Sequence, residues 1–290
     1  MRYSLHALGI GPGAHPHVIA AVARAAERAG FARLWAGEHI VMVDGPDERY
    51  PYAADGRIAV PSDADWLDPF ATLAFAAAAT TSIRLATGVL LLAEHNPLIV
   101  AKQAASLDTL SRGRLDLGIG IGWSRAEFEA LGVPFAGRAA RMREYAEAMR
   151  ELWSTETSSY AGDTVRFAGV RSYPKPQAGR VPLILGGTSD AALDRVAEYG
   201  DGWYGFNLAP ADLPERMRVL AALCEHRGRD LRELDVAVDV GLEHVDVREL
   251  AAMGVSERVL VTGPPTAVGD AETWVQELAS TYGVVRAPVG

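Results

Sequence analysis

Short β-type runs alternate with longer helical stretches along almost the whole chain, and this alternation constrains the fold more than any other feature. Repeated βα units of this kind are typical of a parallel sheet. Because about eight such runs recur, we predict a closed (β/α)8 TIM barrel, an α/β fold. The predicted strands cover residues 3–9, 32–36, 83–91, 115–121, 181–185, 202–206, 234–240 and 258–261.

The helices between these runs also leave clear patterns. In the segment 137–153 the apolar residues fall on one face, which should pack on the barrel. These residues are Met142, Tyr145, Met149, Leu152 and Trp153. Asp68 and Asn96 each precede a proline and therefore predict capped helix starts at 69 and 97.

The bulk composition excludes several classes of protein. A formal net charge of -9 argues against the broad basic surface that nucleic-acid binding needs. A single cysteine, Cys224, excludes an internal disulfide, and we expect it buried on a helix. The first residues lack a secretory signal, and the most apolar stretch, residues 70–79, is about half a membrane span. We therefore expect a cytoplasmic protein of one domain, residues 1–290, with no nucleic-acid or membrane partner.

Two segments are too long to be simple connections. Residues 40–66 follow the second strand and would lie on the carboxyl-terminal face, where barrel active sites are built. This elaborated loop is a candidate lid or substrate wall, and its Tyr50, Tyr52 and Trp66 could equally be exposed or core aromatics. Residues 154–180 alternate around glycines, which predicts a small hairpin inserted before the fifth strand.

The second predicted strand ends in AGEHI, which places Glu38 and His39 at the barrel mouth. A lone histidine is often structural, but a strand-end position beside a carboxylate favours a functional role. A rival pair, His15 and His17, has the HxH spacing of metal-dependent barrel hydrolases. The later strand ends lack the matching Lys, His and Asp residues, and a helix start explains both histidines, so we expect no metal site.

Glycines mark two other strand ends. Gly88 in the third strand permits either close approach of a flat ligand or closure of the barrel, and the sequence leaves both open. The fourth strand ends in GIGIGW, where Gly118, Gly120 and Gly122 occupy alternate positions and would keep one face open. The spacing is not that of a dinucleotide-binding GxGxxG, so this pattern alone is a weak signal.

An anion site is predicted after the fifth strand. Gly186, Gly187, Thr188 and Ser189 precede a helix whose free N–H groups and dipole favour a phosphate. The alternative is a plain helix cap by Thr188 or Ser189.

Together, these strand ends resemble the luciferase-like monooxygenase family, in particular its coenzyme F420-dependent oxidoreductases. The likeness covers nearly the whole chain and is carried by four motifs in the same order. They are LWAGEHIVM, YPYAADGRIAVPSDADWLDPFATLAFAAAAT, IRLATGVLLLAEHNPLIVAKQAASLDTLSRGRLDLGIGIGWSRAEFEALG and VPLILGGTSDAALDRVAEYGDGW.

The resemblance implies a flavin or deazaflavin ring across the barrel mouth. A bulge at Thr87, Gly88 and Val89 would back the ring, with Gly88–Val89 as the candidate non-prolyl cis peptide. The implied cofactor contacts are Gly120, Gly122 and Trp123 for the ring, and Gly186, Gly187, Thr188 and Ser189 for the phosphate.

The same resemblance implies that His39 shuttles a proton or donates a hydrogen bond beside the reactive edge of the ring, and that Glu38 orients His39 or tunes its charge. Many relatives carry Asp-His here, whereas the Glu-His of this chain also occurs in flavin monooxygenases. Glu127 could reach the site, although we favour a role at the start of the next helix.

The implied function is hydride transfer between coenzyme F420 and a small organic substrate. One alternative is an FMN-dependent monooxygenase that uses reduced flavin and O2, and another is a flavin-binding protein without turnover, against which His39 argues. By analogy we expect a homodimer, and a separate flavin or F420 reductase is a possible partner.

Overall fold

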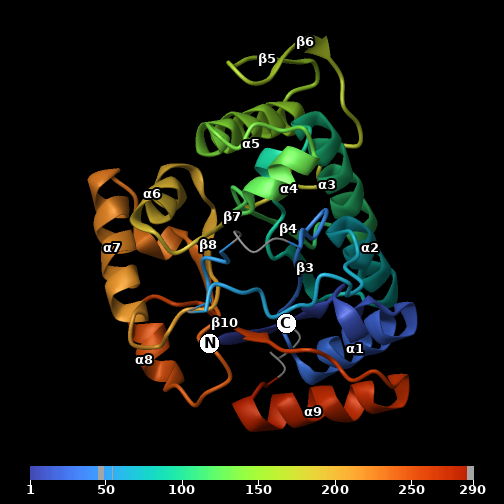
Figure 1. Ribbon diagram of the computed structural model, residues 1–290. Helices are drawn as coiled ribbons and strands as arrows, with labels where there is room; N and C mark the ends of the chain where they lie inside the picture. The colour runs from blue at the N-terminus through green and yellow to red at the C-terminus, as the bar shows by residue number, and fades with distance from the viewer. Residues whose placement is uncertain (45–48, 54, 286–290) are drawn as a thin grey trace.

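Figure 1 shows the computed structural model, which describes residues 1–44, 49–53 and 55–285. Within them, eight parallel strands close into a barrel in the order β1-β10-β9-β8-β7-β4-β3-β2. The predicted (β/α)8 barrel is therefore confirmed. Its strands are β1 (Arg2–Leu8), β2 (Arg33–Ala36), β3 (Arg84–Thr87), β4 (Leu115–Ile119), β7 (Leu183–Gly186), β8 (Gly202–Gly205), β9 (Asp235–Val238) and β10 (Glu257–Val261).

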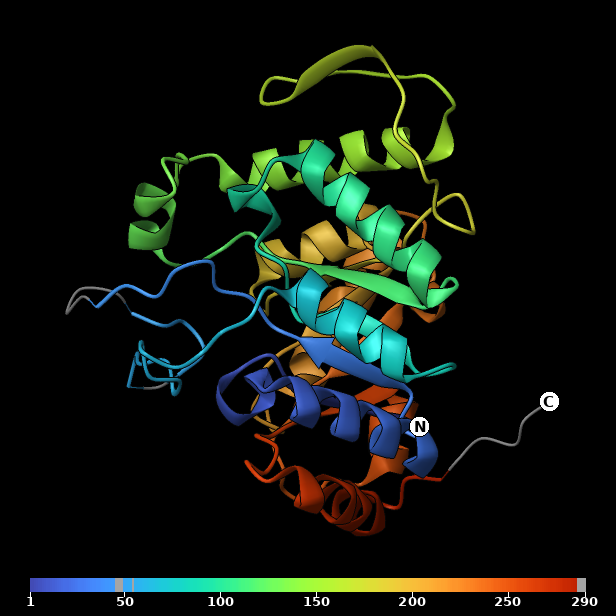
Figure 2. The ribbon, with the colours of Figure 1, turned by 90° about the vertical axis from the view of Figure 1, so that its right-hand side faces the viewer.

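Helices surround the barrel (Figures 1 and 2). They are α1 (Pro16–Ala29), α2 (Pro69–Ala79), α3 (Pro97–Ser111), α4 (Arg125–Ala130), α5 (Arg138–Ser154), α6 (Asp190–Tyr199), α7 (Leu213–His226), α8 (Val247–Ala252) and α9 (Ala271–Tyr282). Single 3-10 turns lie at η1 (Gly11–Ala14), η2 (Leu92–Glu94), η3 (Leu231–Glu233) and η4 (Val268–Asp270). None of the described helices has both the length and the apolar character needed to cross a membrane.

The predicted helix starts are confirmed by hydrogen bonds. The Asp68 carboxylate accepts from the Ala71 N–H at 2.7 Å, and the Asn96 side chain accepts from the Leu98 N–H at 3.0 Å. His15 caps α1, so the HxH pair serves a helix start. Each cap satisfies a backbone donor that would otherwise lack a partner.

The core has two parts. Side chains between strands and helices form the larger part, which includes the predicted apolar face of α5. Inside the barrel, a smaller cluster forms a layer below the carboxyl-terminal mouth. Its buried members are Trp35, Ala86, Ile184, Tyr204, Ala237 and Val259. Cys224 is buried on α7, as expected.

The third strand is shorter than predicted. It ends at Thr87, and beyond it only Leu90 still bridges β4, at Ile119, before η2 begins. The Gly88–Val89 peptide bond is cis, at the predicted position.

Both predicted insertions are present. Strands β5 (Ser158–Ala161) and β6 (Arg166–Val170) form an antiparallel hairpin that lies against the outside of α5 (Figure 1). The described residues between β2 and α2 form no helix or strand beyond a bridge from Trp66 to Ile10, and they project from the barrel (Figure 2). Residues 45–48 and 54 of this predicted loop lie outside the described residues.

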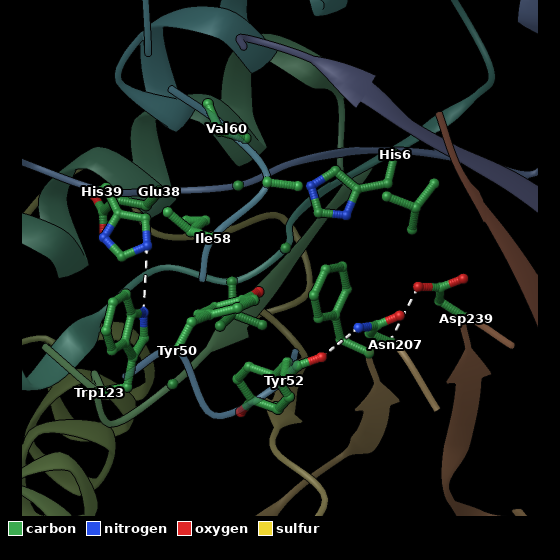
Figure 3. Close-up of a pocket in the computed structure, with 18 of the residues that line it drawn as sticks. His6, Glu38, His39, Tyr50, Tyr52, Ile58, Val60, Trp123, Asn207 and Asp239 are labelled. Carbon is green, nitrogen blue, oxygen red and sulfur yellow. Dashed lines mark hydrogen bonds between the residues drawn. The ribbon is translucent and has the colours of Figure 1, made fainter. Parts of the chain in front are cut away.

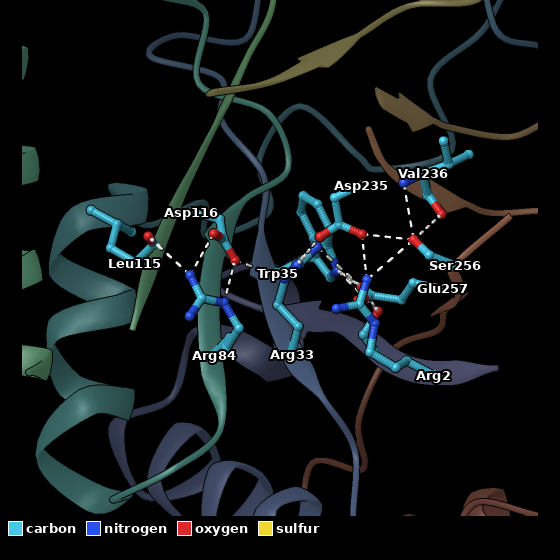
Figure 4. A network of polar contacts seen from close by, with 11 residues as sticks. Arg2, Arg33, Trp35, Arg84, Leu115, Asp116, Asp235, Val236, Ser256 and Glu257 are labelled. Carbon is cyan, nitrogen blue, oxygen red and sulfur yellow. Dashed lines mark hydrogen bonds and ion pairs between the residues drawn. The ribbon is translucent and has the colours of Figure 1, made fainter. Parts of the chain in front are cut away.

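Ion pairs fill the amino-terminal end of the barrel (Figure 4). Arg33 is 1% exposed and contacts Asp116 at 3.0 Å, Asp235 at 2.6 Å and Glu257 at 3.4 Å. The Trp35 indole N–H donates to Glu257 at 3.2 Å from the adjacent interior layer. Polar groups therefore close this end, and the opposite end remains open.

Candidate active site

A cavity of about 1080 Å³ opens among the carboxyl-terminal ends of the barrel strands. Its volume is at the upper end of the range for ligand pockets, about 300–1,000 Å³. Of the residues proposed from the sequence, those that line it are Glu38, His39, Gly88, Val89, Gly120, Gly122, Trp123, Gly186, Gly187, Thr188 and Ser189. Thr87 is not among them, because its buried hydroxyl donates to the Gly118 carbonyl at 2.6 Å instead.

His39 is held by a carboxylate from another strand–helix connection. Its Nδ1 lies 2.7 Å from Glu127 Oε2, and Trp123 Nε1 lies 3.4 Å from its Nε2 (Figure 3). Because a carboxylate only accepts, Nδ1 carries a proton and Nε2 is left as an acceptor. The contact with Trp123 is at the long end of hydrogen-bond geometry, so a ligand donor could replace it.

Glu127 both begins a helix and reaches the site. It is 1% exposed, lies in the first turn of α4, and also accepts from the Ile40 and Val41 N–H groups at 2.7 and 3.2 Å. The expectation that it serves mainly the helix start was therefore incomplete. Its carboxylate fixes both the imidazole and the start of the loop.

Glu38 does not orient His39, contrary to the prediction. Its carboxylate accepts from the Leu91 N–H at 2.6 Å and lies 3.0 Å from His95 Nε2. Consecutive side chains in extended backbone point in opposite directions, which explains why Glu38 and His39 have different partners. Burial lowers the pKa of His95, but the hydrogen bond and charge of Glu38 raise it more, so the pKa is raised overall.

The glycine pattern after β4 has a different cause at each position. A Cβ at Gly118 would lie 1.9 Å from the Thr87 carbonyl oxygen, so this glycine permits close strand pairing and does not open space. Cβ atoms at Gly120 and Gly186 would lie 2.8 and 3.1 Å from the Val89 side chain. Val89 therefore projects between two stretches of bare backbone, a surface that fits a flat ring.

The segment before α6, where the sequence predicts an anion site, lines the cavity and caps the helix. Ser189 Oγ accepts from the Ala192 N–H at 3.3 Å. Gly187 has φ +107°, and a Cβ there would lie 2.9 Å from the Ala192 side chain. The acidic Asp190 in the first turn is exposed and paired with Arg216.

Two arginines beside this predicted anion cradle went unnoticed in the sequence. Arg138 and Arg195 line the cavity, and within the described residues neither forms an ion pair. Burial lowers the pKa of Arg138, as do the guanidinium groups of Arg125, Arg195 and Arg141. Positive charge without an ion-pair partner on a cavity wall favours an anionic ligand.

Aromatic rings line the other side of the cavity (Figure 3). Tyr50 packs edge-on against Tyr52 and Trp123 at 5.4 and 5.3 Å, and Tyr52 packs against Phe206 at 5.8 Å. Trp66 packs against His39 at 4.9 Å. The described part of the loop therefore supplies the apolar wall considered from the sequence.

Three further titratable groups were missed. His6 and Asp239 line the cavity, the former from β1 and the latter just after β9. Glu94 lies behind Gly122, and both of its carboxyl oxygens are buried without a hydrogen-bond partner among the described residues. Burial raises its pKa to about 9, with the charges of Glu127 and Glu38 adding to the effect.

This combination of fold and open mouth is typical of a barrel enzyme. The family model of luciferase-like monooxygenases matches residues 4–279, and the chain belongs to that family. An uncharacterised protein of Mycobacterium tuberculosis, Rv0953c, is 35% identical over 262 residues, which is 90% of this chain and 92% of the relative.

Other relatives have named activities. The pyrimidine monooxygenase RutA of Stutzerimonas stutzeri is 35% identical over 173 residues, 56% of this chain and 47% of RutA. Among solved structures, an F420-dependent secondary alcohol dehydrogenase bound to an F420–acetone adduct superposes with TM-score 0.76 and 18% identity, covering 98% and 99% of the two chains. The F420-dependent tetrahydromethanopterin reductase of Methanopyrus kandleri superposes with TM-score 0.73 and 20% identity, covering 95% of this chain and 97% of the reductase. At these identities the structures establish the shared fold.

Proposed function

We propose that this chain is an oxidoreductase that transfers hydride between coenzyme F420 and a small organic substrate. One observation carries the proposal: the Glu127-held imidazole of His39 lies in the same cavity as the anion cradle and the ring-sized surface around Val89. Binding, ring support and proton handling are thus available within one pocket.

In this proposal each group of cavity residues has a separate role. Gly186–Ser189 and the guanidinium groups of Arg138 and Arg195 would hold the phosphate, and Val89 with its flanking glycines would support the ring. When bound, the deazaflavin supplies two-electron hydride chemistry. When an alcohol is oxidised, His39 Nε2 accepts the hydroxyl proton. When a carbonyl is reduced, His39 returns the proton to the oxygen. Glu127 stabilises the imidazolium that this step forms.

The charge near the cradle favours F420 over FMN. A single phosphate would need one or two cationic partners, whereas Arg138 and Arg195 lie with Arg125 and Arg141 close by. F420 carries side-chain carboxylates in addition to its phosphate, so it would use this excess of positive charge. The F420-dependent structures that share the fold are consistent with this choice.

An FMN-dependent monooxygenase is the second candidate. The Glu38-His39 pair and the sequence similarity to RutA favour it. In that case a separate reductase would supply reduced FMN. We also propose a homodimer, to be tested by sedimentation of the purified protein.

Titration of the purified protein with oxidised F420, oxidised FMN and reduced FMN, followed by fluorescence or heat, tests the cofactor. We expect binding of F420 at micromolar concentration or below, roughly 8 kcal/mol of binding free energy, and weaker binding of FMN. Preference for reduced FMN would establish the monooxygenase, and no binding of either would overturn the proposed pocket.

His39→Ala distinguishes an enzyme from a binding protein without turnover. We expect unchanged cofactor affinity and loss of turnover, because the imidazole handles the proton and the cradle holds the cofactor. His17→Ala is the control, since His17 is exposed at the start of α1. Equal turnover in His39→Ala and the control would contradict the assigned role.

A further inference from the structure

His6 is a second histidine in the cavity, and no step described so far uses it. It lies on β1, is 8% exposed, and lines the mouth of the barrel together with His39. Figure 3 shows the two imidazoles well apart on the cavity wall. They have different partners, so the structure allows them different chemistry.

The hydrogen bond of His6 fixes its tautomer. His6 Nδ1 lies 2.8 Å from the Tyr204 hydroxyl, and in the described part of the chain neither group has another hydrogen-bond partner. If the phenol donates to Nδ1, its proton is satisfied and the imidazole carries its own proton on Nε2. In the other tautomer the buried phenol proton would lack an acceptor, which is costly. The arrangement therefore favours Nε2–H.

Both rings are held rigidly. Tyr204 stacks on Trp35 with centroids 4.5 Å apart and an interplanar angle of 18°. A Cβ at Gly88 would lie 3.1 Å from His6 Cε1, and one at Gly37 would lie 3.2 Å from His6 Nε2, so backbone packs closely against the imidazole. A donor fixed in this way needs little reorganisation when a ligand binds.

The surroundings keep His6 uncharged. Burial lowers the pKa of its imidazole to about 4. The nearby Asp239 gives no ion pair, because its oxygens accept from the Asn207 and Gly241 N–H groups, each at 3.0 Å. Burial also raises the pKa of Tyr204, so the phenol keeps its proton.

We propose that His6 donates a hydrogen bond through Nε2–H to an uncharged acceptor, either a carbonyl of the cofactor ring or the oxygen of the organic substrate. His39 then handles the proton, while His6 polarises the acceptor without giving its proton away. This division rests on the proposed function and extends it to substrate class. An uncharged donor on an aromatic-lined wall selects neutral carbonyl compounds and alcohols over substrates whose reacting end is charged.

The tautomer is tested by nitrogen-15 NMR of the full chain labelled at histidine. His6→Gln assigns the His6 signals, and His17→Gln serves as a control at an exposed histidine. We expect a neutral His6 with the proton on Nε2 between pH 5 and 8 (about one unit or more above its pKa), and a mixture of tautomers in Tyr204→Phe. A proton on Nδ1, or titration near the ordinary histidine pKa, would overturn the proposal.

Ligand additions identify the acceptor. If the cofactor ring takes the bond, oxidised F420 or FMN should shift the His6 Nε2 signal, and His6→Leu should weaken cofactor binding roughly 5- to 10-fold, the usual effect of one neutral hydrogen bond. If the substrate takes it, cofactor binding should be unchanged, and acetone or cyclohexanone added to the cofactor complex should shift the signal.

A His6 signal that responds to neither cofactor nor ketone would overturn the donor role. Failure of the wild-type protein to bind either cofactor would instead overturn the proposed function, and the tautomer of His6 would still be decided by the same spectra. His6→Gln retains a side-chain N–H donor and should recover part of the binding that His6→Leu loses.

Discussion

At the scale of single residues, the site is built from pairs whose members come from different βα units. Glu38 and His39 are neighbours in sequence, yet one bonds to His95 and the other to Glu127. The two pairs lie on opposite sides of one extended segment. The orientation of His39 therefore depends on α4.

Substitutions at Glu127 should separate its role as a hydrogen-bond acceptor from the effect of its charge. We expect Glu127→Ala to lower the free energy of unfolding by about 2–4 kcal/mol, because the Ile40 and Val41 N–H groups and His39 lose their acceptor. Glu127→Gln should cost less, since its amide oxygen can still accept. Urea denaturation of both variants checks this, and equal stability of Glu127→Ala and wild type would refute it.

The buried carboxyl of Glu94, which has no hydrogen-bond partner among the described residues, predicts a dependence of stability on pH. Its pKa is raised from 4.5 to about 9 on folding. Between these values the folded chain holds one more proton than the unfolded chain. The contribution of Glu94 to the free energy of unfolding is therefore full below pH 4.5 and is lost as the pH rises towards 9. The slope is at most about 1.4 kcal/mol per pH unit.

Glu94→Gln removes this titration with little change of shape. Relative to wild type, the variant should gain stability steadily between pH 5 and pH 9 in urea denaturation. Glu156→Gln, at a side chain that is 70% exposed, is the control and should show no such trend. Parallel pH profiles for wild type and Glu94→Gln would show that Glu94 is ionised in the folded protein.

The sequence placed His39 and Gly186–Ser189 at the barrel mouth because both depend on local order: a strand end, and a glycine pair before a helix. It raised the Glu127 contact only as the less favoured alternative and did not identify the two arginines, since those distances arise only when separate βα units close into a barrel. His6 was detectable in principle, because it lies near the carboxyl end of the first strand. Its neighbours in sequence are apolar, however, and strand alternation alone does not show which face meets the cavity.

At the scale of elements, hydrophobic patterning and proline-linked caps located every barrel strand and the inserted hairpin. The predicted length of the third strand is too great, because the apolar run continues past the point where β3 stops pairing with β4. An apolar pattern indicates burial, and Val89 and Leu91 line the cavity while Leu90 packs in the outer core, so the apolar run continues beyond the end of the strand. Pairing of β3 with β4 depends on Gly118, where the Thr87 carbonyl occupies the place of a side chain.

Gly118→Ala should therefore disrupt this pair of strands. A Cβ 1.9 Å from a backbone oxygen forces the strands apart, and we expect a loss of about 3 kcal/mol or more, or failure to fold. Gly263→Ala is the matched control, because a Cβ there meets nothing within 4 Å. Thermal melts of both variants check the prediction, and similar melting temperatures would contradict it.

At the scale of the whole molecule, the two ends of the barrel have separate duties. The amino-terminal end is filled by Arg33 and its three carboxylates, and the carboxyl-terminal end holds the cavity. The apolar layer around Trp35 and Tyr204 thus separates the cavity from the ion pairs of Arg33.

Removal of Arg33 should destabilise the fold and leave the mouth intact. Arg33→Met removes the buried cation that the three carboxylates share and leaves them only the more exposed Arg84 and Arg2. We expect a loss of about 3–5 kcal/mol in urea denaturation. Arg28→Met, which breaks an exposed pair with Glu272, should cost less than about 1 kcal/mol. Similar losses in the two variants would show that the network contributes little to stability.

The described part of the loop after β2 contributes aromatic rings to the cavity and no strand to the barrel. Its start is held by Glu127, and a Cβ at Gly187 would lie 3.9 Å from the Tyr52 hydroxyl, so changes in the loop reshape the cavity while the ion network lies at the opposite end of the barrel. Lineages with this barrel could acquire new substrates by remodelling that one segment. Substitutions confined to residues 49–53 and 57–66 should therefore alter substrate selectivity.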